Sequence, residues 1–313
     1  MTPTPASDSK APTEPFLVIA GPTAVGKSAV ALEVADRCGG EIIGADAFQV
    51  YAGLRVLTAQ PSAEELARVP HHLVSEIPLS RSFDVAQFVA AARERLAAIR
   101  ARGRVAIVCG GTGLYVRALM RGIAELPAAN ADLRAELEAQ PLAQMQRRLA
   151  ELDPVGFAQL DIRNPRRVIR ALEVCLLTGR PFSSFRQEWD RAETASRGVV
   201  LTRDREDLHC RINQRTEGMF AAGVEDEVRA LRELGPTAEQ VIGLRDLRRL
   251  EAGEITHGAC VSAIQQATRR YAKRQLTWFR QEPALTTVNL SVLANREALI
   301  AGLVEQATAL LPR

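Results

Sequence analysis

An eight-residue segment near the N-terminus constrains this chain more than any other feature. It reads Gly-Pro-Thr-Ala-Val-Gly-Lys-Ser, fits the pattern G-x-x-x-x-G-K-[ST], and stands between an apolar run (15–20) and a segment with helical apolar spacing (27–37). Glycines let such a loop wrap an oxyanion, the amides and the helix N-terminus point at it, and the lysine neutralises it. The pattern predicts a diphosphate or triphosphate site, although a glycine turn with an incidental lysine is the alternative. The binding residues of this phosphate loop would be Gly21, Pro22, Thr23, Ala24, Val25, Gly26, Lys27 and Ser28, and the Ser28 hydroxyl could hold Mg²⁺.

Short apolar runs alternate with helical patterns through much of the chain. Runs at 41–45 and 104–109 flank a long helical pattern at 83–102, which is typical of a parallel sheet covered on both faces. From about 128 to 193 the pattern is helical alone. A run at 199–201, further helices to 280, a run at 285–290 and a last helix to 311 follow. We expect an α/β core of residues 15–127 and 196–313, a helical insertion at 128–195, and a disordered leader at 1–14.

Composition excludes several classes of protein. The 313 residues are 47% hydrophobic and 25% charged, as in ordinary globular proteins, and their number suits about two domains. No apolar run approaches the ~20 residues of a membrane-spanning helix, and the first fifteen residues lack an apolar signal core, so we expect a cytoplasmic protein. The five cysteines are scattered, which argues against a zinc site or disulfides, and His71 and His72 have no ligand partner at metal spacing.

The ends of two predicted strands distinguish among phosphate-binding proteins. The run at 104–109 ends in Cys109-Gly-Gly-Thr rather than in the Mg²⁺-binding carboxylate of many hydrolysing ATPases. The carboxylate stands instead at Asp46, after the second strand, where parallel strands line a ligand crevice. A motor ATPase is therefore disfavoured. A turn or helix-cap role for Asp46 remains the alternative.

At this point the motifs together resemble the bacterial tRNA dimethylallyltransferases. The resemblance runs from residue 15 to about residue 280, in ordered blocks. These are 21–28, Asp46-Ala-Phe-Gln-Val-Tyr-Ala-Gly-Leu, Thr58-Ala-Gln-Pro, Pro70-His-His-Leu, Gly110-Gly-Thr-Gly-Leu-Tyr, Arg163-Asn-Pro-Arg-Arg-Val-Ile-Arg-Ala-Leu-Glu, Ile242-Gly and 268–280.

The resemblance implies a fold, a reaction and several roles. The fold is a P-loop nucleotide-kinase-like parallel sheet with helices on both faces and a helical insertion that grips the anticodon stem. The reaction moves a dimethylallyl group from dimethylallyl diphosphate to the exocyclic amine of the adenosine beside the tRNA anticodon, with Mg²⁺ and release of pyrophosphate. Asp46 would be the general base, Thr112 would hydrogen-bond the diphosphate near the breaking bond, and Arg134 would contact the diphosphate. Plain N-cap and solvated-helix roles are the alternatives for Thr112 and Arg134. We expect a monomer.

Basic residues indicate where RNA would bind. Of forty basic side chains all but Lys10, Lys27 and Lys273 are arginines, whose fork suits phosphates. The spacing of Arg163, Arg166, Arg167 and Arg170 predicts one helical side of RNA-binding cations, against the alternative of a solvated charged face. By resemblance the RNA-contacting set is Asp46, Ala47, Phe48, Gln49, Arg163, Arg166, Arg167, Val168, Ile169, Arg170, Gly243, Arg245 and Arg274. The aromatic residues at 271–279 more often pack inward at helical spacing.

Some residues depart from the family pattern, and two other functions share the phosphate loop. Ala47 replaces the usual serine, Leu57 the usual glycine and Gln60 the usual lysine, while Arg55 and the Leu-Arg-Asp at 244–246 are also unusual. These changes bear on RNA affinity more than on the reaction.

The rival functions are a small-molecule or nucleotide kinase, which does not need the Arg-rich insertion, and a prenyltransferase acting on free adenine nucleotides.

Overall fold

The structure, a computed structural model, describes residues 14–123, 126–185 and 196–311. These residues form two compact units: a core unit of 14–120 and 196–311, and a helical unit of 121–123 and 126–185. The predicted leader falls almost wholly on residues 1–13, outside the described residues, and so does the end of the predicted insertion at 186–195.

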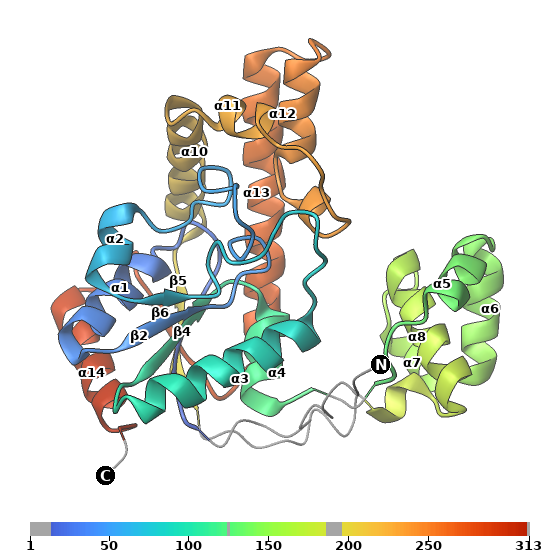
Figure 1. Cartoon of the computed structure of the whole chain (residues 1–313), viewed down its shortest axis with the longest axis horizontal. Coiled ribbons are helices and arrows are strands. Elements are labelled where there is room, and N and C mark those ends of the chain that lie inside the picture. The colour runs from blue at the N-terminus through green and yellow to red at the C-terminus, as the bar shows by residue number, and fades with distance from the viewer. Residues whose placement is uncertain (1–13, 124–125, 186–195, 312–313) are drawn as a thin grey trace. The chain divides into compact units, whose positions relative to one another are not determined.

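The core unit is built on one sheet of six parallel strands. The strand order is β3-β2-β4-β1-β5-β6 (Figure 1), and every pairing is parallel, as the alternating pattern predicts. The strands are β1 (Leu17–Ala20), β2 (Glu41–Gly44), β3 (His71–His72), β4 (Ala106–Gly110), β5 (Arg197–Thr202) and β6 (Thr286–Asn289). Because β1 lies between β4 and β5, the phosphate loop emerges at the centre of the sheet.

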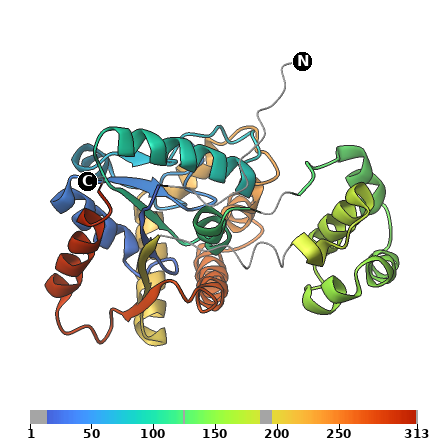
Figure 2. The ribbon, with the colours of Figure 1, turned by 90° about the horizontal axis from the view of Figure 1, so that it is seen from below.

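Helices cover both faces of this sheet. Helix α1 and the last helix pack on one face through a core that includes Leu17 and Ile19 of β1 and Ile300 and Leu303 of α14. Helix α3 lies on the opposite face (Figure 2). The helices of this unit are α1 (Lys27–Cys38), α2 (Ala63–Arg68), α3 (Val85–Ala101), α4 (Gly113–Arg121), α10 (Arg205–Ala221), α11 (Val224–Arg229), η1 (Ala238–Gln240), α12 (Leu244–Glu251), α13 (His257–Phe279) and α14 (Arg296–Thr308).

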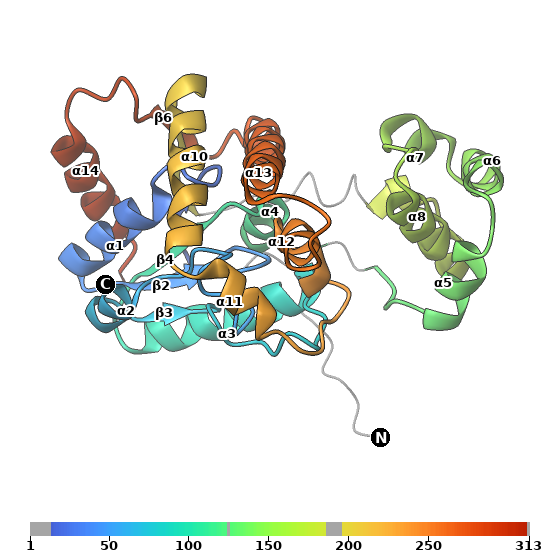
Figure 3. The same cartoon turned by 90° about the horizontal axis from the view of Figure 1, so that it is seen from above.

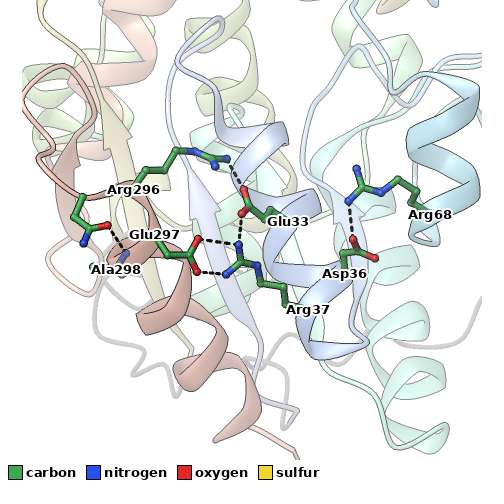
Figure 4. A network of polar contacts seen from close by, with 8 residues as sticks. Glu33, Asp36, Arg37, Arg68, Arg296, Glu297 and Ala298 are labelled. Carbon is green, nitrogen blue, oxygen red and sulfur yellow. Dashed lines mark hydrogen bonds and ion pairs between the residues drawn. The ribbon is translucent and has the colours of Figure 1, made fainter.

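Ion pairs join α1 to α2 and α14 at the surface (Figure 4). Arg37 contacts Glu33 and Glu297, Arg296 contacts Glu33 at 2.6 Å, and Arg68 contacts Asp36 at 2.6 Å. Most of these side chains are well exposed, so each pair adds little to stability. The apolar contacts beneath them hold α14 to α1.

Two long helices define the site end of the core unit. Helices α10 and α13 lie side by side beyond the carboxyl ends of the strands (Figures 1 and 3). They pack through Leu208 and Ile212 on α10 and Ala272 on α13, which join the same core as Val25 of the phosphate loop. The loop is thus covered by helices that come from the far C-terminal part of the chain.

The helical unit has its own small core. Its helices are α5 (Ala131–Glu138), α6 (Leu142–Leu152), α7 (Pro154–Gln159) and α8 (Pro165–Thr178). Asn130, Asp153 and Asn164 cap the N-termini of α5, α7 and α8 through side-chain hydrogen bonds. Leu137, Met145, Leu149 and Leu172 are buried together. In the described parts of both units, no helix is long and apolar enough to span a membrane.

Candidate active site

The phosphate loop connects β1 to α1, as the sequence pattern predicts. Gly21 and Gly26 have φ values of 151° and 104°, and a Cβ at Gly21 would lie 2.5 Å from the Leu201 carbonyl oxygen, so glycine is required there. Lys27 is half-buried, with its Nζ 3.4 Å from the Pro22 carbonyl oxygen. Burial lowers the pKa of Lys27, and the nearby Cys109 and Asp46 oppose that shift. The amino group of Lys27 therefore lies beside the loop.

Asp46 uses one carboxylate oxygen for structure. Its Oδ1 accepts hydrogen bonds from the backbone N–H groups of Phe48 at 3.0 Å and Gln49 at 3.3 Å. This is the turn role that the sequence left as an alternative. In the described part of the chain no group donates to Oδ2, so the second oxygen is available to a ligand. The turn fixes the carboxylate, which makes a structural and a chemical role compatible.

Thr112 ties the loop after β4 to the segment that carries Asp46. Its Oγ1 accepts a hydrogen bond from the Ala47 N–H at 3.0 Å, and its own N–H donates to the Ala45 carbonyl at 3.2 Å. A Cβ at Gly110 would lie 2.1 Å from the same carbonyl oxygen, which explains the glycine there. Thr112 precedes α4, but its hydroxyl reaches across to another loop rather than acting as a simple helix cap.

Helix α13 contributes a residue that sequence reasoning missed. Gln275 is buried; its Oε1 accepts a hydrogen bond from the Thr23 N–H at 2.9 Å, and its Nε2 donates to the Gly111 carbonyl at 2.8 Å. One carboxamide thus joins the phosphate loop to the loop after β4. The hydroxyl of Tyr271, one turn earlier, interacts with Thr112 and Gln275, and burial raises its pKa, which keeps the phenol neutral. The sequence signal that could have identified Gln275 is a polar residue at a position of the helix that faces inward.

Helix α10 contributes a second missed residue. Arg215 donates a hydrogen bond from NH1 to the Thr23 hydroxyl at 2.9 Å and a longer one from NH2 to the Thr58 carbonyl at 3.4 Å. Desolvation lowers its pKa, and the Asp46 carboxylate opposes the shift. Its Nε is buried with no partner among the described residues. A half-buried arginine with a spare donor beside a phosphate loop is suited to an anionic ligand.

Several of these residues line one pocket in the core unit, with a cavity volume of about 60 Å³. Its polar lining includes Thr23, Asp46, Arg215 and Tyr271. The larger apolar part is formed by Phe48, Leu57, Ile212, Met219, Val241 and Ile264. A phosphate loop, a carboxylate and an apolar wall therefore meet in one space, which suits a ligand with an anionic head and an apolar or aromatic body.

Some of the predicted RNA-contacting residues of the core unit lie at or next to the lining of this pocket. Phe48 lines it, and a Cβ at Gly243, which has φ of 90°, would lie 3.3 Å from Leu57 and Ile264 of the lining. Arg274 is exposed, and its guanidinium carbon lies 5.6 Å from the ring centroid of Tyr271. Arg245 is exposed on the first turn of α12. Ala47 and Gln49 belong to the turn of Asp46.

In the helical unit, some predicted contacts are internal and others are exposed. Glu173 is fully buried, and its carboxylate pairs with Arg134 and Arg170. Nε and NH2 of Arg134 donate to its two carboxylate oxygens, each at 3.0 Å. Val168 and Ile169 are packed in the core of the unit. Arg166 and Arg167 are exposed on α8. The expectation that Arg163 shares their helical side is wrong, because α8 begins at Pro165 after the Asn164 cap.

His71 and His72 make hydrogen bonds within the core unit. His71 bonds to the Val69 carbonyl and His72 to the buried Glu41, each through one ring nitrogen. The cysteines are free thiols. Among the described residues no group of three or more metal-ligating side chains occurs.

Comparison with known sequences gives one consistent result. The model of the IPP transferase family matches residues 49–282. The tRNA dimethylallyltransferase of Geobacter metallireducens is 43% identical over 283 residues, which cover 87% of this chain and 92% of that protein. The enzyme of the same name from Phenylobacterium zucineum is 44% identical over 85% of this chain and 90% of its own length.

Solved structures have the same architecture. The full-length tRNA isopentenylpyrophosphate transferase of Bacillus halodurans is 34% identical and aligns with a TM-score of 0.67 over 95% of this chain and 99% of its own. A eukaryotic dimethylallyltransferase acting on tRNA aligns with a TM-score of 0.82 over 96% of this chain and 81% of its own, at 23% identity, so that likeness concerns the fold.

Proposed function

Because this chain belongs to the IPP transferase family, we propose that it is a tRNA dimethylallyltransferase. It transfers a dimethylallyl group from dimethylallyl diphosphate to the exocyclic amine of the adenosine beside the anticodon and releases pyrophosphate. The observation that carries the proposal is the shared pocket: Thr23 of the phosphate loop and the carboxylate of Asp46 line the same space as a group of apolar side chains. The family match disfavours a kinase.

The first chemical task is to stabilise the leaving diphosphate. An allylic C–O bond breaks toward a resonance-stabilised cation, so charge accumulates on the departing pyrophosphate. Lys27 and Arg215 supply positive charge at the phosphate loop, and the hydrogen bonds of Arg215 and Gln275 to Thr23 hold that loop in place. The surrounding apolar side chains exclude water, which would otherwise capture the cation.

The second task is to take a proton from a weak nucleophile. The adenine amine has its lone pair conjugated into the ring, so a positioned base increases its reactivity. With Oδ1 of Asp46 held by two backbone N–H groups, Oδ2 is free to accept the proton as the new N–C bond forms. The target base must leave the anticodon stack to reach this carboxylate.

Mg²⁺ fits the oxygen donors at the loop. This ion prefers one or two protein oxygens together with substrate phosphates and water. Ser28, exposed at the start of α1, would hold it with a diphosphate oxygen. When bound, the ion would offset charge on the diphosphate. The protein's own part is to present the hydroxyl and the cation of Lys27 on adjacent residues.

Mass spectrometry of nucleosides tests the proposed function. Unmodified tRNA is incubated with the protein, Mg²⁺ and dimethylallyl diphosphate, then digested, and we expect a prenylated adenosine. Parallel reactions with free AMP and with ATP in place of the prenyl donor distinguish the rival activities. Prenylated AMP without prenylated tRNA, or phosphoryl transfer from ATP, would overturn the proposal.

A further inference from the structure

Helix α10 holds the phosphate loop from outside through a series of arginines. Arg203, just before the helix, donates from Nε to the Val25 carbonyl at 2.8 Å, and Arg211 donates from Nε to the Ala24 carbonyl at 2.9 Å. Arg215 reaches Thr23, as described above. Three arginines therefore contact three successive loop residues in reverse order. Arg203 and Arg211 each donate from Nε to a backbone carbonyl oxygen. A carbonyl oxygen is an acceptor and cannot itself bind an anionic ligand.

The loop residue that Arg211 contacts has an unfavourable backbone conformation. Ala24 has φ of 63°, in the left-handed region that favours glycine. Its Cβ makes that conformation costly, and a contact that fixes its carbonyl group helps to hold it. The Arg211 guanidinium binds the carbonyl of this residue and is well placed to do so.

The contact of Arg203 sets the direction of the next amide. A trans peptide is planar, so its C=O and the following N–H point in opposite directions. With the Val25 carbonyl turned toward Arg203, the Gly26 N–H points the other way. Asp207 pairs with Arg203 at 2.7 Å and accepts a hydrogen bond from Ser291 at 2.6 Å, which fixes the guanidinium.

We propose that Arg211, supported by Arg203, is a positioning residue that holds the phosphate loop in its anion-binding form before a ligand arrives. It acts through the Ala24 carbonyl and not by contact with the diphosphate. The proposal deepens the proposed function, on which it rests, by explaining how the loop keeps a strained residue in place. Removal of Arg211 lets Ala24 relax, so that part of the ligand's binding energy is used to restore the loop.

The test is a double-mutant cycle between Arg211→Ala and Ala24→Gly. Glycine adopts a positive φ without strain, so it reduces the need for the arginine. We expect Arg211→Ala to weaken pyrophosphate binding about 10-fold by isothermal titration calorimetry, and to raise the KM for dimethylallyl diphosphate similarly, with tRNA affinity unchanged. In the Ala24→Gly background the same substitution should weaken pyrophosphate binding less than about 3-fold.

Two further measurements separate positioning from charge and from folding. Arg205→Ala removes the same charge from an exposed position at the start of α10, and we expect less than about a 2-fold effect on pyrophosphate affinity. Thermal melting of each variant reports folding. If Arg211→Ala loses the same pyrophosphate affinity in the wild-type and Ala24→Gly backgrounds, Arg211 contacts the ligand directly. If Arg205→Ala and Arg211→Ala lose the same affinity, the effect is one of net charge. Either result, or full pyrophosphate affinity in Arg211→Ala, overturns the proposal.

Pyrophosphate titration needs neither RNA nor turnover. If the wild-type protein does not prenylate tRNA, the proposed function fails while the binding cycle still decides the role of Arg211. If prenylation occurs and the cycle shows no coupling, the positioning role alone fails.

Discussion

Asp46 has one oxygen in a turn and one free, and this division makes its role measurable. In Asp46→Asn the side-chain oxygen can still accept the N–H groups of Phe48 and Gln49, so the turn survives while basicity is lost. We expect single-turnover prenyl transfer to fall about 100- to 10,000-fold, the usual worth of a general base. Melting temperature and tRNA affinity should stay near wild type. Full activity would leave the carboxylate with a turn role only.

Lys27 carries the clearest pH prediction. Lys27→Ala should reduce turnover at least ~100-fold, because one stabiliser of the leaving diphosphate is removed.

In the wild-type protein, desolvation lowers the pKa of Lys27 below its usual 10.5, so the ammonium is present at low pH and is lost as pH rises through this reduced value. Pyrophosphate affinity should therefore begin to fall, as pH rises, at a value below 10.5. In Lys27→Ala the alkaline loss should disappear; if it persists, another group titrates.

Residues within continuous motifs were predictable, and residues brought in by packing were not. Lys27, Asp46 and Thr112 lie in the loops that follow strands, so local pattern identified them. Arg215 and Gln275 reach Thr23 from 192 and 252 positions away in the sequence. No spacing rule connects such positions, because their meeting depends on how α10 and α13 pack beyond the sheet.

At the scale of elements, the buried strands and helices α1 and α3 were predictable to within a few residues, whereas α10 and α13 were predicted only as part of a helical stretch that ends at 280. Apolar runs marked β1, β2, β4, β5 and β6. Strand β3 was not predicted, because its two residues, His71 and His72, carry no apolar pattern. Helix α2 was not predicted either, since it is short and buries none of its side chains.

The buried carboxylate of Glu173 on helix α8 allows a prediction about stability. Burial alone would raise the pKa of Glu173, but hydrogen bonds from Arg134 and Arg170 and from the Asn130 N–H lower it below the usual 4.5. The stability from these contacts is therefore complete above pH 4.5 and is lost as pH falls through the lower folded value. Glu173→Gln should destabilise the helical unit by about 1.5–3 kcal/mol.

Hydrogen exchange measured by mass spectrometry localises this effect. Amides of α5 and α8 should exchange faster in Glu173→Gln, while those of α3 should not change. The matched control is Glu151→Gln, at an exposed position of α6, with unchanged exchange expected. Unchanged protection of α5 and α8 in Glu173→Gln would show that the buried carboxylate adds nothing to this unit.

At the scale of the whole molecule, RNA binding is best tested on Arg166 and Arg167. Both are exposed on α8, whereas Arg170 pairs with Glu173. Replacing both by Ala should raise the KM for tRNA and reduce the salt slope of tRNA binding by about one unit per lost phosphate contact. The KM for dimethylallyl diphosphate should not change.

A matched pair of arginines serves as the control for that double variant. Arg147 and Arg148 are exposed on α6 of the same unit, so Arg147→Ala with Arg148→Ala removes equal charge. We expect a smaller change in slope. Equal slopes in the two double variants would indicate general electrostatic attraction rather than contacts made by α8.

The position of β1 in the sheet sets an order of events during synthesis on the ribosome. This strand pairs with β4, which precedes the helical unit in the chain, and with β5, which is made only after that unit. The helices α5 to α8 contact one another locally and can close early, but β1 has an open edge until residue 202 has emerged. Slow translation across 126–196 would therefore prolong exposure of that edge to aggregation, and faster passage would shorten it.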